Sequence, residues 1–337
     1  MYSFSFVHCW GNNSVGQLGQ PYSVQTSPSP LRIAGLNVPS RLTCGHQHAC
    51  IMDGHSPKCW GLNSTGQLGN GSTVNSHVAL PVNTPYEYKQ IAAGYDHTCG
   101  LVAQPSSSNN LLQCWGGNAS GQLGTGDGSS IKMTPATLAR KGWIWVAAGV
   151  SMTCAIDSDI YCWGANDQGQ LGTGDQNQYS LPTMSVETTG FTQVSAWGKT
   201  TCGIDDKGQM WCWGDGSAGQ MGNNTYTADN LTPVLVQPYK PWNPDPTTFI
   251  SISSGGNHVC ATDVTWQMFC WGDNTYGQCG VNSATPTQPR LWQPLSWDLG
   301  IASARNNVTL YRIVTCMPDD QPTVAQAPQP HGRKLLN

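Results

Sequence analysis

The sequence predicts an all-β protein that folds as a β-propeller of four-stranded blades. A motif that starts Cys-Trp-Gly and ends Gly-Gln-Leu-Gly, or a close variant of it, is written six times. Successive copies begin 50, 55, 48, 50 and 58 residues apart, at Cys9, Cys59, Cys114, Cys162, Cys212 and Cys270. This period is typical of propellers and other arrays, in which each unit buries its apolar face only against its neighbours. We therefore expect one closed domain over residues 1–317 rather than two ordinary ones.

Each unit also contains a strand of small residues, a glycine-centred turn and a second strand that carries a cysteine. This element occurs at residues 41–52, 91–99, 146–154, 194–202 and 252–260. Small side chains such as Ala92 and Ala93 suit an innermost strand, because several units crowd together at the central axis. The third strand ends in Cys-Trp-Gly, and its tryptophan is expected to fill the space between adjacent units. The tight Gly-Gln-Leu-Gly turn then leads to an outermost strand, which completes a four-stranded blade.

The two ends of the chain are incomplete units. Residues 4–10 predict a strand that runs into the first turn, and residues 31–33 a short outer strand. Near the other end, residues 301–308 align with 147–154, which places Cys316 at the third-strand cysteine position. We expect N- and C-terminal strands to share the last blade, with Cys9 and Cys316 as candidates for a closure disulfide. The alternative is a truncated further blade, and residues 318–337 predict a disordered, proline-rich tail.

The 14 cysteines follow the repeat. Because a pair recurs at one position in five units, we expect one disulfide per unit and an oxidising compartment. The expected pairs are Cys50–Cys59, Cys99–Cys114, Cys154–Cys162, Cys202–Cys212 and Cys260–Cys270. Zinc is the competing interpretation, but the chain has no Cys-x-x-Cys and its gaps are unlike those of zinc fingers. Cys44 and Cys279 have no assigned partner.

Seven Asn-x-Ser/Thr sequons agree with a secreted protein, since a glycan needs an exposed turn. They begin at Asn12, Asn63, Asn70, Asn118, Asn223, Asn230 and Asn307. Three of these asparagines also belong to the turn of the repeat, which is a structural reason for their presence. Residues 1–7 lack the basic start and long apolar run of a signal peptide. Either the chain starts inside a larger gene product, or the inference of secretion fails.

The composition argues against several classes of partner. Only 10% of the residues are charged and the net charge is −4. No cluster of basic residues precedes Arg333-Lys334, so a nucleic-acid partner is not expected. The sequence contains no run of about 18 apolar residues that would cross a membrane, and no motif that calls for a cofactor.

The repeated pattern resembles the regulator-of-chromosome-condensation repeat, whose signature joins Gly-x-x-His-Ser/Thr to Trp-Gly-x-Asn-x-x-Gly-Gln-Leu-Gly. The resemblance covers residues 4–316 and implies a propeller, usually of seven blades; our own count gives six to seven. The cysteine positions resemble the secreted or receptor-ectodomain branch, as in crinkly-type plant receptor kinases. The plant ultraviolet-B photoreceptor belongs to the same family, but its Gly-Trp-Arg-His-Thr motif is replaced here, for example by Gly94-Tyr95-Asp96-His97-Thr98. A photosensory dimer is therefore not expected.

Few residues qualify as a catalytic or metal site. His48, His97 and His258 occupy the histidine position of the repeat, one per blade, so we expect structural hydrogen bonds rather than a shared metal. The glycine-rich turns lack a P-loop lysine, and no Gly-x-Ser-x-Gly sequence occurs. We therefore expect no enzyme activity.

Trp197 stands where the repeat has glycine, and six further tryptophans outside the motif are candidates for packing or for partner contact: Trp143, Trp145, Trp242, Trp266, Trp292 and Trp297.

These features predict an extracellular or secretory-pathway protein that recognises a protein or other ligand through loops on one rigid face. Two alternatives remain open. The family resemblance implies a guanine-nucleotide exchange factor for a small GTPase, which would act in the cytoplasm or nucleus. A secreted bacterial inhibitor of β-lactamase shares the fold, so a secreted proteinaceous enzyme inhibitor is the second alternative.

Overall fold

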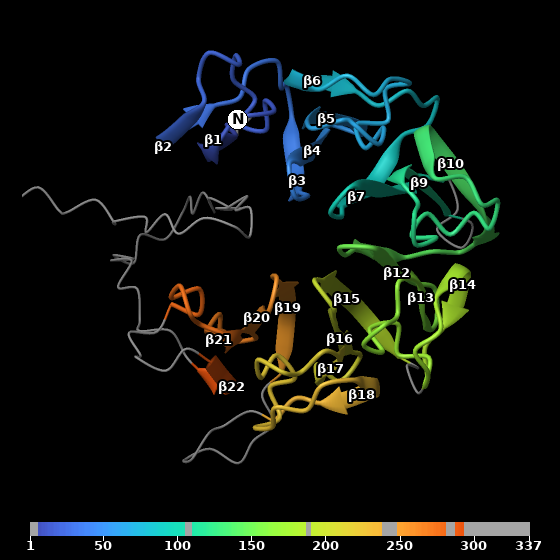
Figure 1. The fold of residues 1–337 in the computed structure, drawn as a ribbon, viewed down its shortest axis with the longest axis vertical. Helices are drawn as coiled ribbons and strands as arrows, with labels where there is room; N and C mark the ends of the chain where they lie inside the picture. The colour runs from blue at the N-terminus through green and yellow to red at the C-terminus, as the bar shows by residue number, and fades with distance from the viewer. Residues whose placement is uncertain (1–5, 105–109, 187–189, 238–247, 281–286, 293–337) are drawn as a thin grey trace, which may run out of the picture.

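The structure, a computed structural model, describes residues 6–104, 110–186, 190–237, 248–280 and 287–292. Within these ranges the chain forms only β-sheets, arranged side by side around a common centre (Figure 1). The first sheet has two antiparallel strands, β1 (His8–Asn12) and β2 (Thr26–Arg32). Both are longer toward the turn than the sequence predicted, because pairing continues to Asn12 opposite Thr26.

Five four-stranded blades follow the first sheet, each an antiparallel meander in chain order. The first two consist of β3 (Pro39–Cys44), β4 (His48–Asp53), β5 (Ser56–Gly61), β6 (Ser76–Pro81), and of β7 (Tyr88–Ala93), β8 (His97–Val102), β9 (Leu111–Gly117), β10 (Ile131–Lys141). The third and fourth consist of β11 (Trp145–Ala148), β12 (Met152–Ile156), β13 (Ile160–Gly164), β14 (Tyr179–Met184), and of β15 (Phe191–Trp197), β16 (Thr200–Asp205), β17 (Met210–Gly214), β18 (Asn230–Leu235). The fifth consists of β19 (Phe249–Ser254), β20 (His258–Asp263), β21 (Met268–Asp273), β22 (Thr287–Trp292).

The first strand of each blade lies innermost, as the small side chains predicted, and contacts the first strand of the next blade. The tryptophan of each third strand is buried in the seam between two blades. In one such seam, Cys50, Cys59 and Leu68 pack against Tyr88 and Trp115 of the following blade. Each blade therefore buries its apolar side only because a neighbour covers it, as expected of a repeat array.

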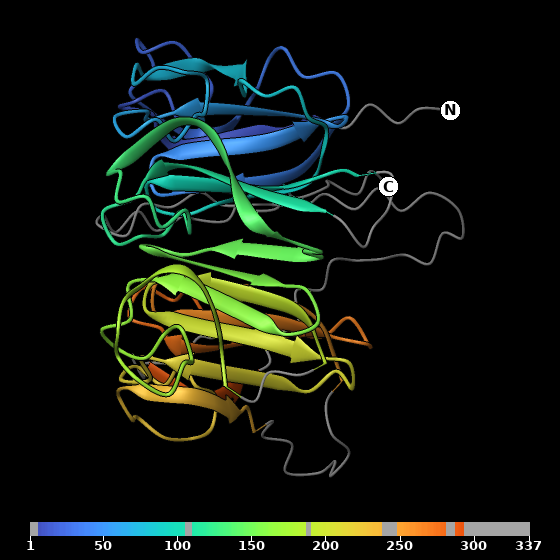
Figure 2. The same cartoon turned by 90° about the vertical axis from the view of Figure 1, so that its right-hand side faces the viewer.

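The meander sorts the connections onto two faces. The short turns between first and second strands lie at the same end as the long loops between third and fourth strands, and we call this end the turn face. The hairpins between second and third strands and the connections between blades lie at the opposite end, the hairpin face. Figure 2 shows the turn face on the left and the hairpin face on the right.

The all-β propeller fold and five of its blades are established, whereas ring closure is not. In β1, Cys9 occupies the third-strand position, so β1 and β2 form the outer half of a blade. Residues 301–316, which we expected to complete that blade, and the predicted tail over 318–337 lie outside the described residues. Within the described part of the chain, no helix has the length and apolar character needed to cross a membrane.

Candidate recognition face

The turns between first and second strands form a hydrogen-bonded collar on the turn face. The backbone N–H of Tyr95 donates to the carbonyl of Gly149 in the next blade at 3.0 Å. On the other side, the imidazole of His46 stacks on the Tyr95 ring, with centroids 4.0 Å apart and planes 10° from parallel. Tyr95 remains 39% exposed. The collar therefore presents a flat aromatic pair whose position is set by backbone bonds between blades.

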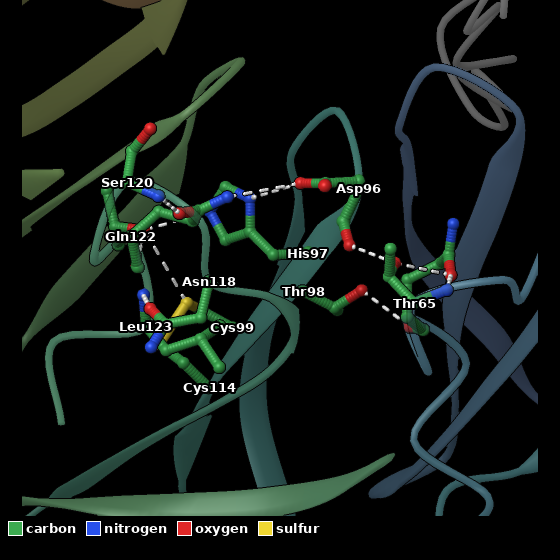
Figure 3. Close-up of polar contacts among 12 residues, drawn as sticks. Thr65, Asp96, His97, Thr98, Cys99, Cys114, Asn118, Ser120, Gln122 and Leu123 are labelled. Atoms are coloured by element: carbon green, nitrogen blue, oxygen red, sulfur yellow. Dashed lines mark hydrogen bonds and ion pairs between the residues drawn. A yellow bond between two sulfur atoms is a disulfide. The ribbon is translucent and has the colours of Figure 1, made fainter. Parts of the chain in front are cut away.

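Asp96 lies beside this pair and connects two loops (Figure 3). Its backbone carbonyl accepts a hydrogen bond from Thr65 Oγ1 at 2.9 Å, and its carboxylate accepts one from Gln122 Nε2 at 3.3 Å. Partial burial raises the pKa of the Asp96 carboxyl above its ordinary value, although the Gln122 bond partly offsets this. Asp96 is thus an acidic group that is partly desolvated before any partner arrives.

The seams behind the collar are joined by a repeated hydrogen-bond relay. The carbonyl of Gln122 accepts from Trp163 Nε1 at 2.9 Å and from Thr153 Oγ1 at 2.8 Å, both in the next blade. The same Thr153 hydroxyl lies 2.9 Å from His97 Nε2. An identical arrangement joins Gln67 to the blade that follows it. The glutamine, tryptophan, threonine and histidine of the motif are therefore used to attach one blade to the next.

His48 and His97 are buried within this relay. Burial lowers the pKa of His48 to about 3 and that of His97 to about 4, so both are neutral at pH 7. His97 Nδ1 lies 3.9 Å from the Asp96 carboxylate, but an uncharged imidazole makes no ion pair with it. No group of side chains suited to a metal occurs among the described residues. His258 lies against Gly255 at the same position of the fifth blade. The expected structural hydrogen bonds of His48 and His97 are confirmed.

Replacing Thr153 tests the relay. In Thr153→Val the isosteric side chain leaves His97 Nε2–H buried without an acceptor. We expect a loss of about 1–3 kcal/mol in the free energy of unfolding, measured by urea denaturation. Thr183→Val on the outer strand β14 is the matched control and should change stability by less than about 0.5 kcal/mol. Equal effects of the two substitutions would refute the relay.

The asparagine of the motif holds the long loop of each blade together. Asn63 Oδ1 accepts from the Leu68 backbone N–H at 2.9 Å, and its Nδ2 donates to the carbonyls of Ser72 and Val74. Asn63 is 0% and Asn118 8% exposed. A glycan on either would displace these buried bonds, so burial argues against both as acceptors. Asn12, Asn70, Asn223 and Asn230 are at least partly exposed, and Asn307 lies outside the described residues.

All five expected disulfides are present in the structure: Cys50–Cys59, Cys99–Cys114, Cys154–Cys162, Cys202–Cys212 and Cys260–Cys270. Each joins residues directly opposite one another on the second and third strands, with Cα atoms 4.0–4.1 Å apart. Cys44 is disulfide-bonded as well.

The expected closure disulfide between Cys9 and Cys316 needs correction. Cys9 is a free thiol that is buried in the seam beside Leu18 and Trp60. Burial raises its pKa to about 11. Cys316 lies outside the described residues. Cys279, which replaces the leucine of Gly-Gln-Leu-Gly, is also free and buried, and burial raises its pKa to about 12.

The unusual Trp197 has a local explanation. At Gly45 and Gly94, a Cβ atom would lie 2.3 Å from Cε1 of the histidine three residues later. In the fourth blade that histidine is replaced by Thr200, whose short side chain bonds the carbonyl of Asp215. The histidine contact that requires glycine at Gly45 and Gly94 is therefore absent at Trp197. The second contact at those glycines is to a backbone carbonyl of the next blade, 2.3 Å from a Cβ at Gly45 and 2.5 Å from a Cβ at Gly94.

Charge on the turn face is predominantly negative. Two lysines on the described part of this face, Lys132 and Lys199, form ion pairs with Asp127 and Asp167. The carboxylates of the same face are Asp96, Asp127, Asp167, Asp175, Asp215, Asp229 and Asp273. Several of them also cap their own loops, as Asp273 does by accepting from the Thr275 backbone at 2.8 Å. The face nevertheless favours a partner with basic groups.

Comparison with known families agrees with this architecture. The regulator of chromosome condensation (RCC1) repeat matches residues 6–52, 59–101, 157–204 and 207–262, and a second model of the repeat matches 249–278. The chain therefore belongs to the RCC1-repeat family of β-propellers.

Individual relatives are more distant. The chain is 30% identical to the ultraviolet-B receptor UVR8 of Arabidopsis thaliana over 306 residues, which are 86% of this chain and 67% of the receptor. Human WBSCR16 superposes with a TM-score of 0.74 at 18% identity, covering 86% of this chain and 79% of that one. Prp20p from Saccharomyces cerevisiae, described by its binding to Gsp1p and histones, gives 0.61 at 15% identity, covering 89% and 88%. At these identities the two structures establish the fold alone.

Proposed function

We propose that this RCC1-repeat propeller is an extracellular or secretory-pathway recognition module that binds a protein partner through its turn face. The observation that carries the proposal is the disulfide within each described four-stranded blade. Disulfides persist in oxidising compartments and are rare in the cytosol and nucleus. We accordingly propose that the chain belongs to the disulfide-containing, receptor-ectodomain branch of the family.

The turn face supports the second half of the proposal. A stacked His46–Tyr95 pair beside the partly desolvated Asp96 offers aromatic area and a carboxylate within one rigid collar. Aromatic anchors and buried charges concentrate binding energy at protein interfaces. The preferred partner presents basic side chains, and it is held by stoichiometric binding without catalysis.

A thiol count on protein isolated from its native source is the first test. Mass spectrometry with and without reduction should find the ten cysteines of the five pairs oxidised and linked as in the structure. Fourteen free thiols would overturn the extracellular assignment.

The exchange-factor alternative is tested separately. Both with its disulfides intact and with reducing agent present, a substoichiometric amount of the chain should leave the rate of nucleotide release from a small GTPase unchanged. Accelerated release would replace our proposal with that alternative. The inhibitor alternative also predicts stoichiometric binding. It is distinguished by measuring the activity of the bound enzyme, which an inhibitor would lower.

A further inference from the structure

Two neighbouring hairpins on the hairpin face have the same conformation but different tips. In β16–β17, Asp205 Oδ1 accepts from the backbones of Lys207 and Gln209, and Gly208 N–H donates to the Asp205 carbonyl at 3.0 Å. In β20–β21, Asp263 Oδ1 accepts from the backbones of Thr265 and Gln267, and Trp266 N–H donates to the Asp263 carbonyl at 2.9 Å. Trp266 therefore stands at the position that Gly208 occupies in the preceding blade.

This position requires a left-handed backbone, which glycine adopts freely and a bulky residue does not. The φ of Gly208 is 75° and that of Trp266 is 65°. The Trp266 side chain is 73% exposed, and Val264 and Met268 on either side are 53% and 48% exposed. The hairpin thus holds a large side chain in an unfavourable conformation without burying it. Such departures from local preference concentrate at functional sites.

A shallow pocket adjoins this apolar tip on the same face. Ile204, Asp206, Gly208, Thr248 and Phe249 are among the residues that line it. Thr248 separates pocket and tip, because its Cγ2 faces Gly208 while its carbonyl accepts the Val264 backbone N–H at 2.9 Å. Ile204 and Phe249 line the pocket with side chains that are themselves almost fully buried. The Asp206 carboxylate at its rim is exposed and accepts no hydrogen bond from the residues that the structure describes.

We propose that the hairpin face pairs with a second copy of this chain, each Trp266 entering the pocket beside Thr248 of its partner. A two-fold interface requires that a patch and its complement lie side by side on one surface, and the tip and pocket do so. The indole Nε1–H, which has no acceptor in the described chain, gains the Asp206 carboxylate of the other copy. Residues 264–268 carry no charge, so they offer no electrostatic attraction to anionic lipid or to nucleic acid.

Sedimentation equilibrium of the full chain, with disulfides intact, tests the proposal. We expect a monomer–dimer equilibrium, and in Trp266→Gly a dimer dissociation constant raised about 1,000-fold, because the two-fold interface loses two aromatic hot spots, each worth about 30-fold. At a concentration at which both proteins are monomeric, the same variant should unfold at an equal or higher temperature, because glycine relieves the left-handed backbone. Loss of dimer with retained stability separates an interface effect from damage to the fold.

Two further variants sharpen the test. Asp206→Asn should weaken the dimer, since it replaces the proposed carboxylate acceptor. Tyr276→Ala is the matched control, because Tyr276 is 71% exposed but lies on the turn face, and it should leave the dimer constant unchanged. A chain that stays monomeric at about 100 µM, or a Trp266→Gly variant that dimerises like the wild type, would overturn the proposal. If the monomer sediments with neutral phosphatidylcholine vesicles and the Trp266→Gly variant does not, the tip binds lipid and the proposal is also overturned.

Discussion

Reduction of the five within-blade disulfides should abolish cooperative unfolding of the propeller at neutral pH. The paired cysteines are 8 to 15 residues apart, and cross-links closing loops of this size stabilise by about 2.5–3 kcal/mol each in the chain-entropy model. The five hairpins are separate, so their contributions add to roughly 13 kcal/mol. That is as large as the whole free energy of unfolding of a typical domain, about 5–15 kcal/mol.

Urea denaturation followed by tryptophan fluorescence, before and after reduction and alkylation, measures this effect. A double variant Cys154→Ala/Cys162→Ala isolates one disulfide and should lower the free energy of unfolding by about 2–4 kcal/mol. Because the paired cysteines are as buried as the free Cys9 and Cys279, reduction and alkylation are carried out on the unfolded protein, and an oxidised control is unfolded and alkylated in parallel without reductant. A reduced protein whose midpoint stays within about 0.5 M urea of the oxidised one would show that blade packing alone holds the fold.

The sequence predicted the blade well because its constraints repeat. Cys50 and Cys59, and their counterparts in four other units, must lie opposite one another if the hairpin is regular, and the structure has them so. The small residues of the inner strands and the seam position of Trp115 follow from the same repetition. Five copies of one pattern give several independent chances to recognise a structural role.

Features that depend on how two blades meet could not be predicted. The His46–Tyr95 stack joins unlike residues from neighbouring units, so no repeated spacing signals it. Trp266 was visible as a tryptophan outside the motif, but its left-handed backbone emerges only when its hairpin is compared with that of Gly208. The Cys9–Cys316 pairing was wrong because it matched leftover cysteines by elimination. In the bonded pairs a third-strand cysteine joins the second-strand residue directly opposite, as Cys59 joins Cys50, whereas Cys9 is free.

Mild acid should destabilise the propeller through the two seam histidines. Their pKa values, about 3 for His48 and about 4 for His97, lie below the value of about 6.5 in an unfolded chain. Between pH 6.5 and pH 4 the unfolded state therefore binds protons that the folded state does not. Stability is constant above pH 6.5 and falls as the pH drops below it, by about 1.4 kcal/mol per pH unit per histidine.

Between pH 7 and pH 5, the two histidines together should remove about 4 kcal/mol from the free energy of unfolding. Most carboxylates stay ionised in that range, so they contribute little to the slope. A His48→Gln/His97→Gln variant should be less stable at pH 7 yet lose far less on going to pH 5. Urea denaturation of both proteins at the two pH values decides the matter. If wild type and variant lose equal stability between pH 7 and pH 5, protonation of His48 and His97 does not cause the acid destabilisation. The relay would then serve only to align the blades.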